Sequence, residues 1–289
     1  MTWLYLGVWS ALSVANTALA AVQQPAEQAQ WQLSGDAFQC QLQQQISGLG
    51  QVRFILNPGQ PLQLQLSLAQ PHDALEQVSV AARGADWQAA SAQWLTERYV
   101  AELYHHSQAS FIKAALPLLQ QIQAGAWLHF SVGNASVERT LLLSSTHPAR
   151  AVADFQGCVA KMAPLSWQQA RQHELYFNTG RYQLDAEQLQ WLGKLARYIA
   201  LDRKVTKILL DGHTDDVGTT LANRLLSQQR ADEVAAQLLE LGVPATMLEV
   251  RAHGNRYPLQ QSRGTAEANN RRVSLRLIRT TELAGANKP

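Results

Sequence analysis

The hydrophobic pattern of this 289-residue chain changes near Leu165, and the change limits what each half can fold into. Residues 62–68 alternate leucine with glutamine or serine, which is the period-two pattern of a half-buried strand. Residues 189–199 instead repeat apolar side chains at helical spacing. We therefore expect an α+β protein, with a β-rich N-terminal domain followed by a C-terminal domain in which helices cover a sheet.

In the N-terminal half, further strands are predicted at residues 127–133 and 136–145. Residues 109–125 have the pattern of a helix, with Pro117 as a site for a kink. These elements leave open whether the strands form a Greek key or a barrel.

The C-terminal half predicts the order β-α-β-α-β-β, an α/β sandwich. Its strands are expected at residues 175–177, 207–212, 247–254 and 271–279, and its helices at 184–200 and 221–242. Asp185 and Gln188 have the spacing of a capping box at the first helix. Gly242 is a good stop for the second helix.

The N-terminus resembles a targeting segment. An apolar run at residues 3–14 precedes a small-x-small cleavage motif at Ala18–Ala20, although the first basic residue is Arg53. We expect cleavage after Ala20, and the alternative is an uncleaved anchor. The predicted domains are a signal peptide (1–20), a β-rich domain (21–164), an α/β domain (165–279) and a disordered tail (280–289).

The chain has two cysteines, Cys40 and Cys158. An exported chain meets an oxidising compartment, so we expect one disulfide between them. Closing so long a loop stabilises the fold by about 4–5 kcal/mol in the chain-entropy model. The alternative is two buried free thiols, and a zinc site lacks further ligands at metal spacing.

Charge is unevenly distributed along the chain. Residues 171–279 hold 16 Lys/Arg and 12 Asp/Glu, a net charge of +4, whereas the remainder carries −2. The C-terminal half therefore weakly favours an anionic partner. It lacks the basic runs and interleaved aromatic residues of a nucleic-acid module, so we expect no nucleic acid partner. The sequence also predicts no cofactor.

One helix face and the turn before it bring together groups that could bind a ligand. Asn223, Ser227 and Arg230 have the spacing of one helical face, and Asp215 lies in the preceding turn. A carboxylate and a guanidinium placed this way suit a zwitterion, because one binds an ammonium and the other a carboxylate.

Three other readings of this stretch remain open on the sequence alone. Asp215 and Arg230 could simply pair with each other on a solvated surface. His213, Asp215 and Asp216 could hold a metal, although adjacent residues on a turn rarely converge on one ion. Catalysis has little support, because Ser227 has no general base in the pattern, and we expect no enzymatic activity.

The same stretch resembles the OmpA-like peptidoglycan-binding family over about residues 172–279. The matching elements are Thr214-Asp215, Asn223, Leu226-Ser227, Arg230-Ala231 and Asn270-Arg271-Arg272-Val273. The resemblance implies that Asp215 and Arg230 bind the diaminopimelate residue of the peptidoglycan stem peptide. Thr214, Asn223, Ser227, Arg271 and Arg272 would lie beside them. Ala222 and Ala252-His253-Gly254 depart from the usual aromatic positions of the family.

The N-terminal half resembles the MotY family of sodium-type flagellar motors, in residues 31–54 and in the "DFQGCVAKM" segment around Cys158. The resemblance implies a periplasmic protein that is associated with peptidoglycan and the flagellar basal body. There it would anchor or assemble stator proteins, with ring assembly implied as well. The alternatives are a general envelope anchor with another partner, and a wall-modifying enzyme.

Overall fold

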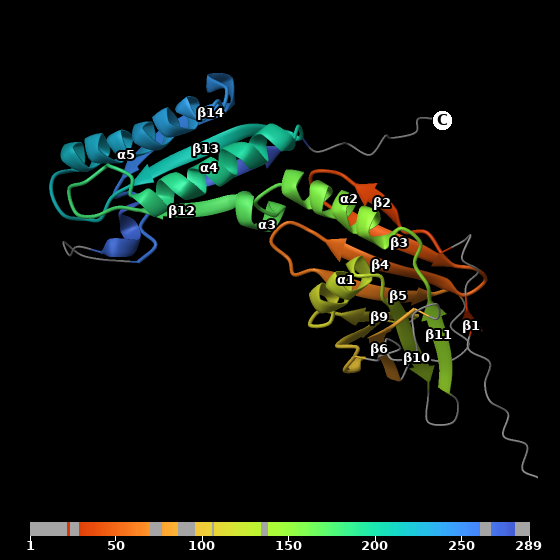
Figure 1. The fold of residues 1–289 in the computed structure, drawn as a ribbon. Coiled ribbons are helices and arrows are strands. Elements are labelled where there is room, and N and C mark those ends of the chain that lie inside the picture. Colours follow the sequence, from red (N-terminus) through yellow and green to blue (C-terminus); the bar gives the residue numbers. More distant parts are fainter. Residues whose placement is uncertain are drawn as a thin grey trace, which may run out of the picture. The chain divides into compact units, whose positions relative to one another are not determined.

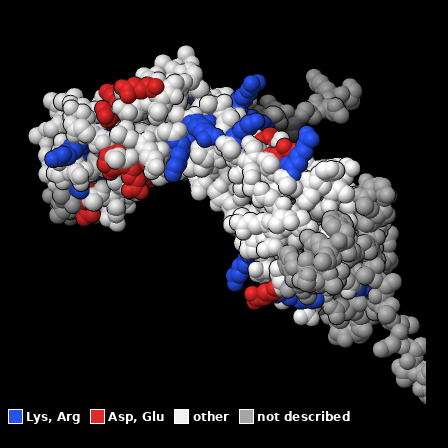
Figure 2. Space-filling model, in the orientation of Figure 1, with Lys and Arg blue, Asp and Glu red and all other residues white. Residues whose placement is uncertain are grey.

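The computed structural model describes residues 22–23, 29–69, 77–85, 96–105, 107–133, 138–260 and 267–280 (Figure 1). The predicted signal peptide (1–20) lies outside these residues, as does the predicted tail (280–289) apart from its first residue, Thr280. No helix in the described part is long and apolar enough to span a membrane. Charged residues make up 16% of the chain, and Figure 2 shows them as separate groups on a largely uncharged surface.

The chain forms two compact units. The N-terminal unit runs to Gln32 and includes Leu42–Phe54 and Gln63–Val152. The C-terminal unit contains Leu33–Gln41, Ile55–Leu62 and the described residues from Ala153 onward. Residues from both sides of the boundary predicted at 164/165 therefore belong to one compact unit, and that domain boundary stays a prediction.

Two sheets make the N-terminal half β-rich, as the sequence predicts. One contains β2 (Gln32–Gly35), β3 (Cys40–Ile46), β4 (Gly50–Leu56), β5 (Gln63–Leu68), β8 (Leu103–His105) and β9 (Gln108–Phe111), in the order β2-β3-β4-β5-β9-β8. The other contains β1 (Val22–Gln23), β6 (Gln77–Arg83), β7 (Tyr99–Val100), β10 (Trp127–Gly133) and β11 (Glu138–Leu143), in the order β1-β11-β10-β6-β7. The predicted alternation is confirmed at residues 63–66, because Leu64 and Leu66 are fully buried and Gln63 and Gln65 are half-buried, whereas Leu62 and Leu68 are half-buried like Ser67.

The helix predicted at residues 109–125 is shorter than expected. Its first residues belong to β9, and α1 spans Ala115–Gln123. Pro117 lies in the first turn of α1, where a helix does not use the backbone N–H, so the proline does not interrupt the helix. A second helix in this region, α2 (Pro148–Lys161), was not predicted.

The C-terminal fold has the predicted β-α-β-α-β-β order. Its elements are β12 (Gln172–Tyr176), α4 (Ala186–Leu201), β13 (Val205–His213), α5 (Thr220–Glu240), β14 (Leu248–Gly254) and β15 (Arg272–Arg279), preceded by the short α3 (Trp167–Ala170). The sheet order is β12-β15-β13-β14, with β13 and β14 parallel and β15 antiparallel to β12 and β13. The capping box of Asp185 and Gln188 forms at the start of α4.

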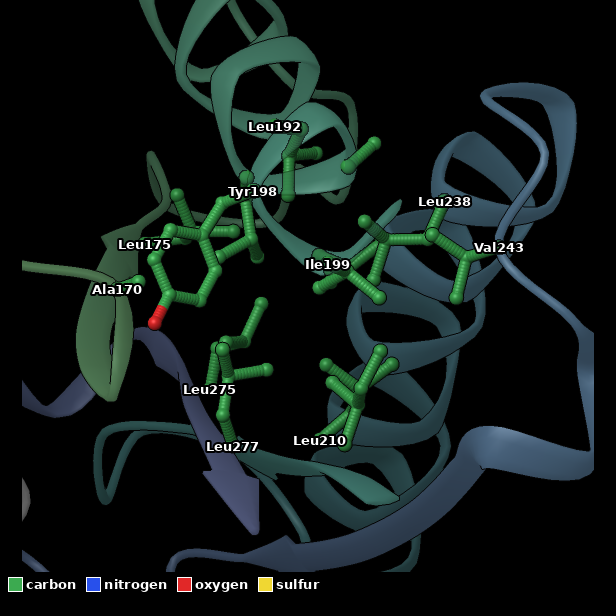
Figure 3. Close-up of a cluster of buried hydrophobic side chains, with 14 of the residues drawn as sticks. Ala170, Leu175, Leu192, Tyr198, Ile199, Leu210, Leu238, Val243, Leu275 and Leu277 are labelled. Carbon is green, nitrogen blue, oxygen red and sulfur yellow. The ribbon is translucent and has the colours of Figure 1, made fainter. Parts of the chain in front are cut away.

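The apolar sides of α4 and α5 pack against one face of this sheet. Figure 3 shows Leu192 and Ile199 of α4 together with Leu210 of β13 and Leu275 of β15 in the core. Leu189 belongs to the predicted stripe of α4 but is 40% exposed, because it lies in the first turn, beyond the core.

The disulfide predicted between Cys40 and Cys158 is present and joins the start of β3 to α2. Nearby, Ala163 donates its backbone N–H to the Ala37 carbonyl at 2.7 Å. The ring of Phe38 packs edge-on against Tyr198 of α4, with 5.6 Å between centroids. These contacts fasten residues 33–41 to the C-terminal fold within one compact unit.

Candidate ligand-binding site at the start of α5

The candidate site lies where β13 ends and α5 begins. A Cβ atom at Gly212 would lie 2.1 Å from the Ser227 carbonyl oxygen, so only glycine lets β13 approach α5 this closely. Thr219 then caps α5, because its side chain accepts the Ala222 N–H. The close approach places the turn of residues 214–218 beside the buried face of α5.

Arg230 is fully buried on that face and is held by backbone carbonyls. Its guanidinium donates to the carbonyl oxygens of Arg181 at 2.9 Å, His213 at 3.1 Å and Asn178 at 3.2 Å. It also lies over the ring of Phe177, 5.3 Å from the centroid. Three of its five N–H groups are therefore used, and no carboxylate of a described residue lies within ion-pair distance of the positive charge.

The pKa of Arg230 is lowered to about 10. Burial is the main cause, the nearby Arg271 charge adds to it, and the Asp215 charge opposes it. The guanidinium is still charged at neutral pH. The site therefore holds a buried cation at an energetic cost, which favours an anionic group nearby.

Asp215 is buried and pairs with Arg271 rather than with Arg230. Its Oδ2 accepts Arg271 Nη1 at 3.1 Å, whereas no described residue donates to its Oδ1. Arg271 Nε also donates to the Phe177 carbonyl at 3.0 Å. A solvated surface pair between Asp215 and Arg230, the simplest alternative from the sequence, is not what the structure contains.

Two buried polar atoms beside this turn, Thr214 Oγ1 and Asn223 Nδ2, have no hydrogen-bond partner among the described residues, and both residues are at least 95% buried. A buried polar atom without a partner costs about 1–3 kcal/mol, so such atoms are normally satisfied by water or by a ligand. Their concentration next to Asp215 is typical of a binding site.

Two of the sequence-predicted site residues have structural contacts instead. Ser227 is fully buried, donates to the Arg224 carbonyl at 2.8 Å and accepts the Gly254 N–H at 3.0 Å, which ties α5 to the end of β14. Arg272 starts β15, in which Val273 points into the core, so Arg272 points to the other sheet face. There it pairs with Glu174 at 3.3 Å.

The structure therefore brings together Thr214, Asp215, Asn223, Arg230 and Arg271, and it places Ser227 and Arg272 in contacts that support the fold. Sequence reasoning missed the carbonyls that hold Arg230, because a carbonyl leaves no signal in residue type. It also assigned no role to Asn270, which is buried and accepts the backbone N–H groups of Leu259 and Gln260. The sequence signal that could have pointed to Asn270 was its place directly before the two arginines.

A separate charged cluster occupies the other sheet face at the same end of β13. Asp211 accepts two hydrogen bonds from Arg251, each at 2.7 Å, and one from His253 at 2.7 Å. The imidazole of His253 stacks on that of His213, with 5.0 Å between centroids. We call Asp211, Arg251 and His253 the Asp211 cluster.

A metal at His213, Asp215 and Asp216 does not fit these contacts. Asp215 faces Arg271, His213 stacks on His253, and Asp216 accepts Asn255 Nδ2 at 2.6 Å. Within the described ranges, no group of three or more His, Cys, Asp or Glu residues could hold a metal ion.

Comparison with known proteins assigns both halves of the chain. The model of the OmpA family matches residues 176–272, and the model of the MotY N-terminal domain matches residues 22–164. The outer-membrane lipoprotein YfiB of Pseudomonas aeruginosa is 34% identical over 111 residues, which are 38% of this chain and 65% of the relative. The peptidoglycan-associated lipoprotein of Haemophilus influenzae is 34% identical over 90 residues, 31% of this chain and 58% of the relative.

The sodium-type flagellar protein MotY of Vibrio parahaemolyticus is 22% identical over 264 residues, which are 88% of this chain and 89% of the relative. That similarity extends over both halves, whereas the two lipoproteins are each similar to less than two fifths of the chain. The chain therefore carries an OmpA family domain in its C-terminal half, and its N-terminal half matches the model of the MotY N-terminal domain.

Proposed function

We propose that this protein is a non-enzymatic periplasmic adaptor that binds peptidoglycan through the site around Asp215 and Arg230. The observation that carries the proposal is the arrangement of these two charges. Both are buried, neither neutralises the other by direct pairing, and uncompensated polar atoms lie beside them. Such a site is prepared for a ligand that brings opposite charges of its own.

The diaminopimelate residue of a peptidoglycan stem peptide has the required chemistry. Its free end carries an ammonium and a carboxylate on one carbon. The ammonium would donate to Oδ1 of Asp215, which no described residue occupies, and the carboxylate would accept from the guanidinium of Arg230. Thr214 and Asn223 would supply hydrogen bonds to the same ligand. The name of the Haemophilus relative, a peptidoglycan-associated lipoprotein, supports this ligand class.

For the cellular role, we propose that the protein works at the flagellar motor. The MotY N-terminal domain would dock on the basal body, and the C-terminal domain would fix the assembly to the cell wall. In this way the protein would help anchor or assemble stator units, with several copies in a ring. Similarity to a sodium-type flagellar protein over 88% of the chain supports this role. A general envelope anchor is the alternative, supported by relatives that match the C-terminal part alone.

Export to the periplasm is part of the proposal. The Cys40–Cys158 disulfide suits an oxidising compartment. Mass mapping of protein taken from the cell envelope should find that linked peptide pair and an N-terminus at Ala21. Two free thiols in the native protein would contradict the assignment.

Two experiments test the function. The mature chain should sediment with purified peptidoglycan, and a soluble diaminopimelate stem peptide should release it, whereas the lysine-containing peptide should not. A deletion strain should lose swimming while it keeps intact filaments. Failure of the mature chain to sediment with peptidoglycan would contradict the proposed wall binding. Normal swimming with wall binding preserved would leave the general envelope anchor, and release of soluble wall fragments would indicate an enzyme.

A further inference from the structure

The candidate site contains one more positive charge than negative charge. Asp215 is the acid, and Arg230 and Arg271 are the two cations. The side chains of Asp215 and Arg271 are 8% and 13% exposed, and Arg230 is fully buried. Bulk water therefore screens these three charges poorly.

The neighbouring acids have partners of their own. Asp211 is bound by Arg251 and His253 on the other face of the sheet. Glu174 pairs with Arg272, and Asp216 accepts a hydrogen bond from Asn255. These contacts leave the excess positive charge at Asp215, Arg230 and Arg271 without a balancing carboxylate among the described residues.

Arg271 keeps donors that could bind such a carboxylate. Its Nε and Nη1 are used by Phe177 and Asp215, but no described residue accepts from its Nη2. The effect of its charge reaches Arg230, since it contributes to the lowered pKa of that guanidinium. A ligand carboxylate beside Arg271 would offset the repulsion between the two cations as well as form its own hydrogen bond.

We infer that this site selects stem peptides that present two carboxylates for each ammonium, with the second carboxylate bound by Arg271. The inference rests on the proposed function. A diaminopimelate end alone is a zwitterion and leaves the charge of the site at +1. The free α-carboxylate of the adjacent D-glutamate supplies the missing negative charge. A wall in which this carboxylate is amidated is therefore a poor ligand for the protein.

A matched pair of ligands tests the inference. One is N-acetyl-L-Ala-γ-D-Glu-diaminopimelate-D-Ala with an amidated C-terminus, which carries two carboxylates and one ammonium. The other has D-isoglutamine in place of D-glutamate, so only the second carboxylate is removed. A third peptide, with lysine in place of diaminopimelate, reports on the zwitterion itself. Binding of each to the mature chain is measured by calorimetry.

We expect the peptide with D-glutamate to bind roughly ten- to a hundredfold more tightly than its amidated partner, as for the loss of one charge-assisted hydrogen bond. Arg271→Gln should bring that ratio close to one, whereas Arg271→Lys should keep part of it. Arg276→Gln, at an exposed position of β15, is the control and should keep the full ratio. The ratio of the two peptide affinities for the wild-type protein tests the inference even if an Arg271 variant does not fold.

The outcomes separate the two proposals. Equal affinity for the two diaminopimelate peptides, with weak binding of the lysine peptide, would overturn the inference and leave the proposed function standing. An Arg271→Gln protein that folds and keeps the full preference would also overturn it, because Arg271 would then not be the group that reads the second carboxylate. Absence of binding by all three peptides and by whole peptidoglycan would remove the proposed function itself.

Discussion

Asp211 and Asp215 are four residues apart at the end of β13, yet their surroundings differ in kind. Asp211 accepts hydrogen bonds on both oxygens, from Arg251 and His253. Asp215 accepts one bond from Arg271 and keeps an oxygen without a donor among the described residues. A carboxylate saturated by its own protein supports the fold, whereas an unsaturated buried carboxylate is available to a ligand.

The cations of the two clusters differ in the same way. The side chain of Arg251 is 38% exposed, and its hydrogen bond to Asp211 raises its pKa. Arg230 is fully buried, and burial lowers its pKa. Carbonyl oxygens accept the hydrogen bonds of the Arg230 guanidinium, but they do not neutralise its charge. Charge balance, more than the number of hydrogen bonds, therefore distinguishes the candidate site from the Asp211 cluster.

The largest expected effect is that of Arg230→Ala on stability. The change removes three hydrogen bonds, leaves the buried carbonyl of His213 without its donor and empties the space of a fully buried side chain. We expect a loss of about 3–5 kcal/mol in the free energy of unfolding, measured by urea denaturation. A loss below about 1 kcal/mol would mean that the carbonyls find water and that Arg230 is not a structural anchor.

The second-largest effect is expected for Asp215→Asn, which should lower peptide affinity more than stability. Asp215→Asn keeps the size of the side chain and removes the charge that would meet the ammonium. We expect the affinity for a soluble diaminopimelate peptide to fall by about 2–4 kcal/mol, with a smaller change in unfolding. The matched variant Asp211→Asn should lower stability and leave peptide affinity unchanged. Similar binding losses in both variants would break the distinction between the two clusters.

Because the proposed assembly holds several copies, whole peptidoglycan is the less sensitive probe for this comparison. Many stems bound at once compensate for a weaker single contact, so sedimentation with the wall would hide part of the loss.

The double variant Asp215→Asn/Arg230→Lys should lose less peptide-binding free energy than the sum of the two single losses, since both groups act on one ligand. Additive losses would indicate independent roles.

Much of the C-terminal fold was predictable because its signals are local. Helical stripes, the capping box at Asp185 and the glycine stop at Gly242 all depend on residues close in the chain, and each appears in the structure. The exception within this half is Leu189, whose exposure depends on how far the core extends along α4. Element order follows from such patterns, whereas burial at an element's end depends on packing.

The site was predictable in its charges and not in its support. The sequence shows Asp215 in the turn and Arg230 on the helix that follows it, but the contacts of Arg230 come from carbonyls at residues 178 and 181, which any residue type could supply. Arg271 and Arg272 look equivalent in sequence. The pleat of β15 sends Arg272 to the opposite sheet face, whereas Arg271, just before the strand, reaches Asp215.

His213 connects the two clusters and should make stability depend on pH. Its carbonyl accepts from Arg230, and its ring stacks on His253 and lies near the charges of Arg272 and Asp211. Burial is the main cause that lowers its pKa from 6.5 to about 4; the charges of Arg272 and His253 lower it further, and the charge of Asp211 opposes them. The unfolded chain therefore binds more protons between these values, so stability is full above pH 6.5 and falls as the pH drops toward 4.

His213 should contribute about 3 kcal/mol at most to the loss over that window, from the size of its pKa shift, and His173, whose pKa burial also lowers from 6.5, acts in the same direction. Unfolding in urea at several pH values measures it, and His213→Gln should flatten the slope. The lowered pKa of Asp211 acts below its usual value of 3.8, so it does not contribute in this window. An unchanged slope in the variant would assign the acid sensitivity to another group.

The smallest effect is expected for Arg251→Ala in the Asp211 cluster. Its ion pair with Asp211 is partly exposed, so the free energy of unfolding should fall by only about 0.5–1 kcal/mol. Asp211 would keep His253 as a partner, and the excess positive charge at the candidate site would be untouched. Peptide affinity should therefore equal that of the wild type. If Arg251→Ala weakened peptide binding as much as Asp215→Asn, the two sheet faces would act as one site, and charge balance would not distinguish them.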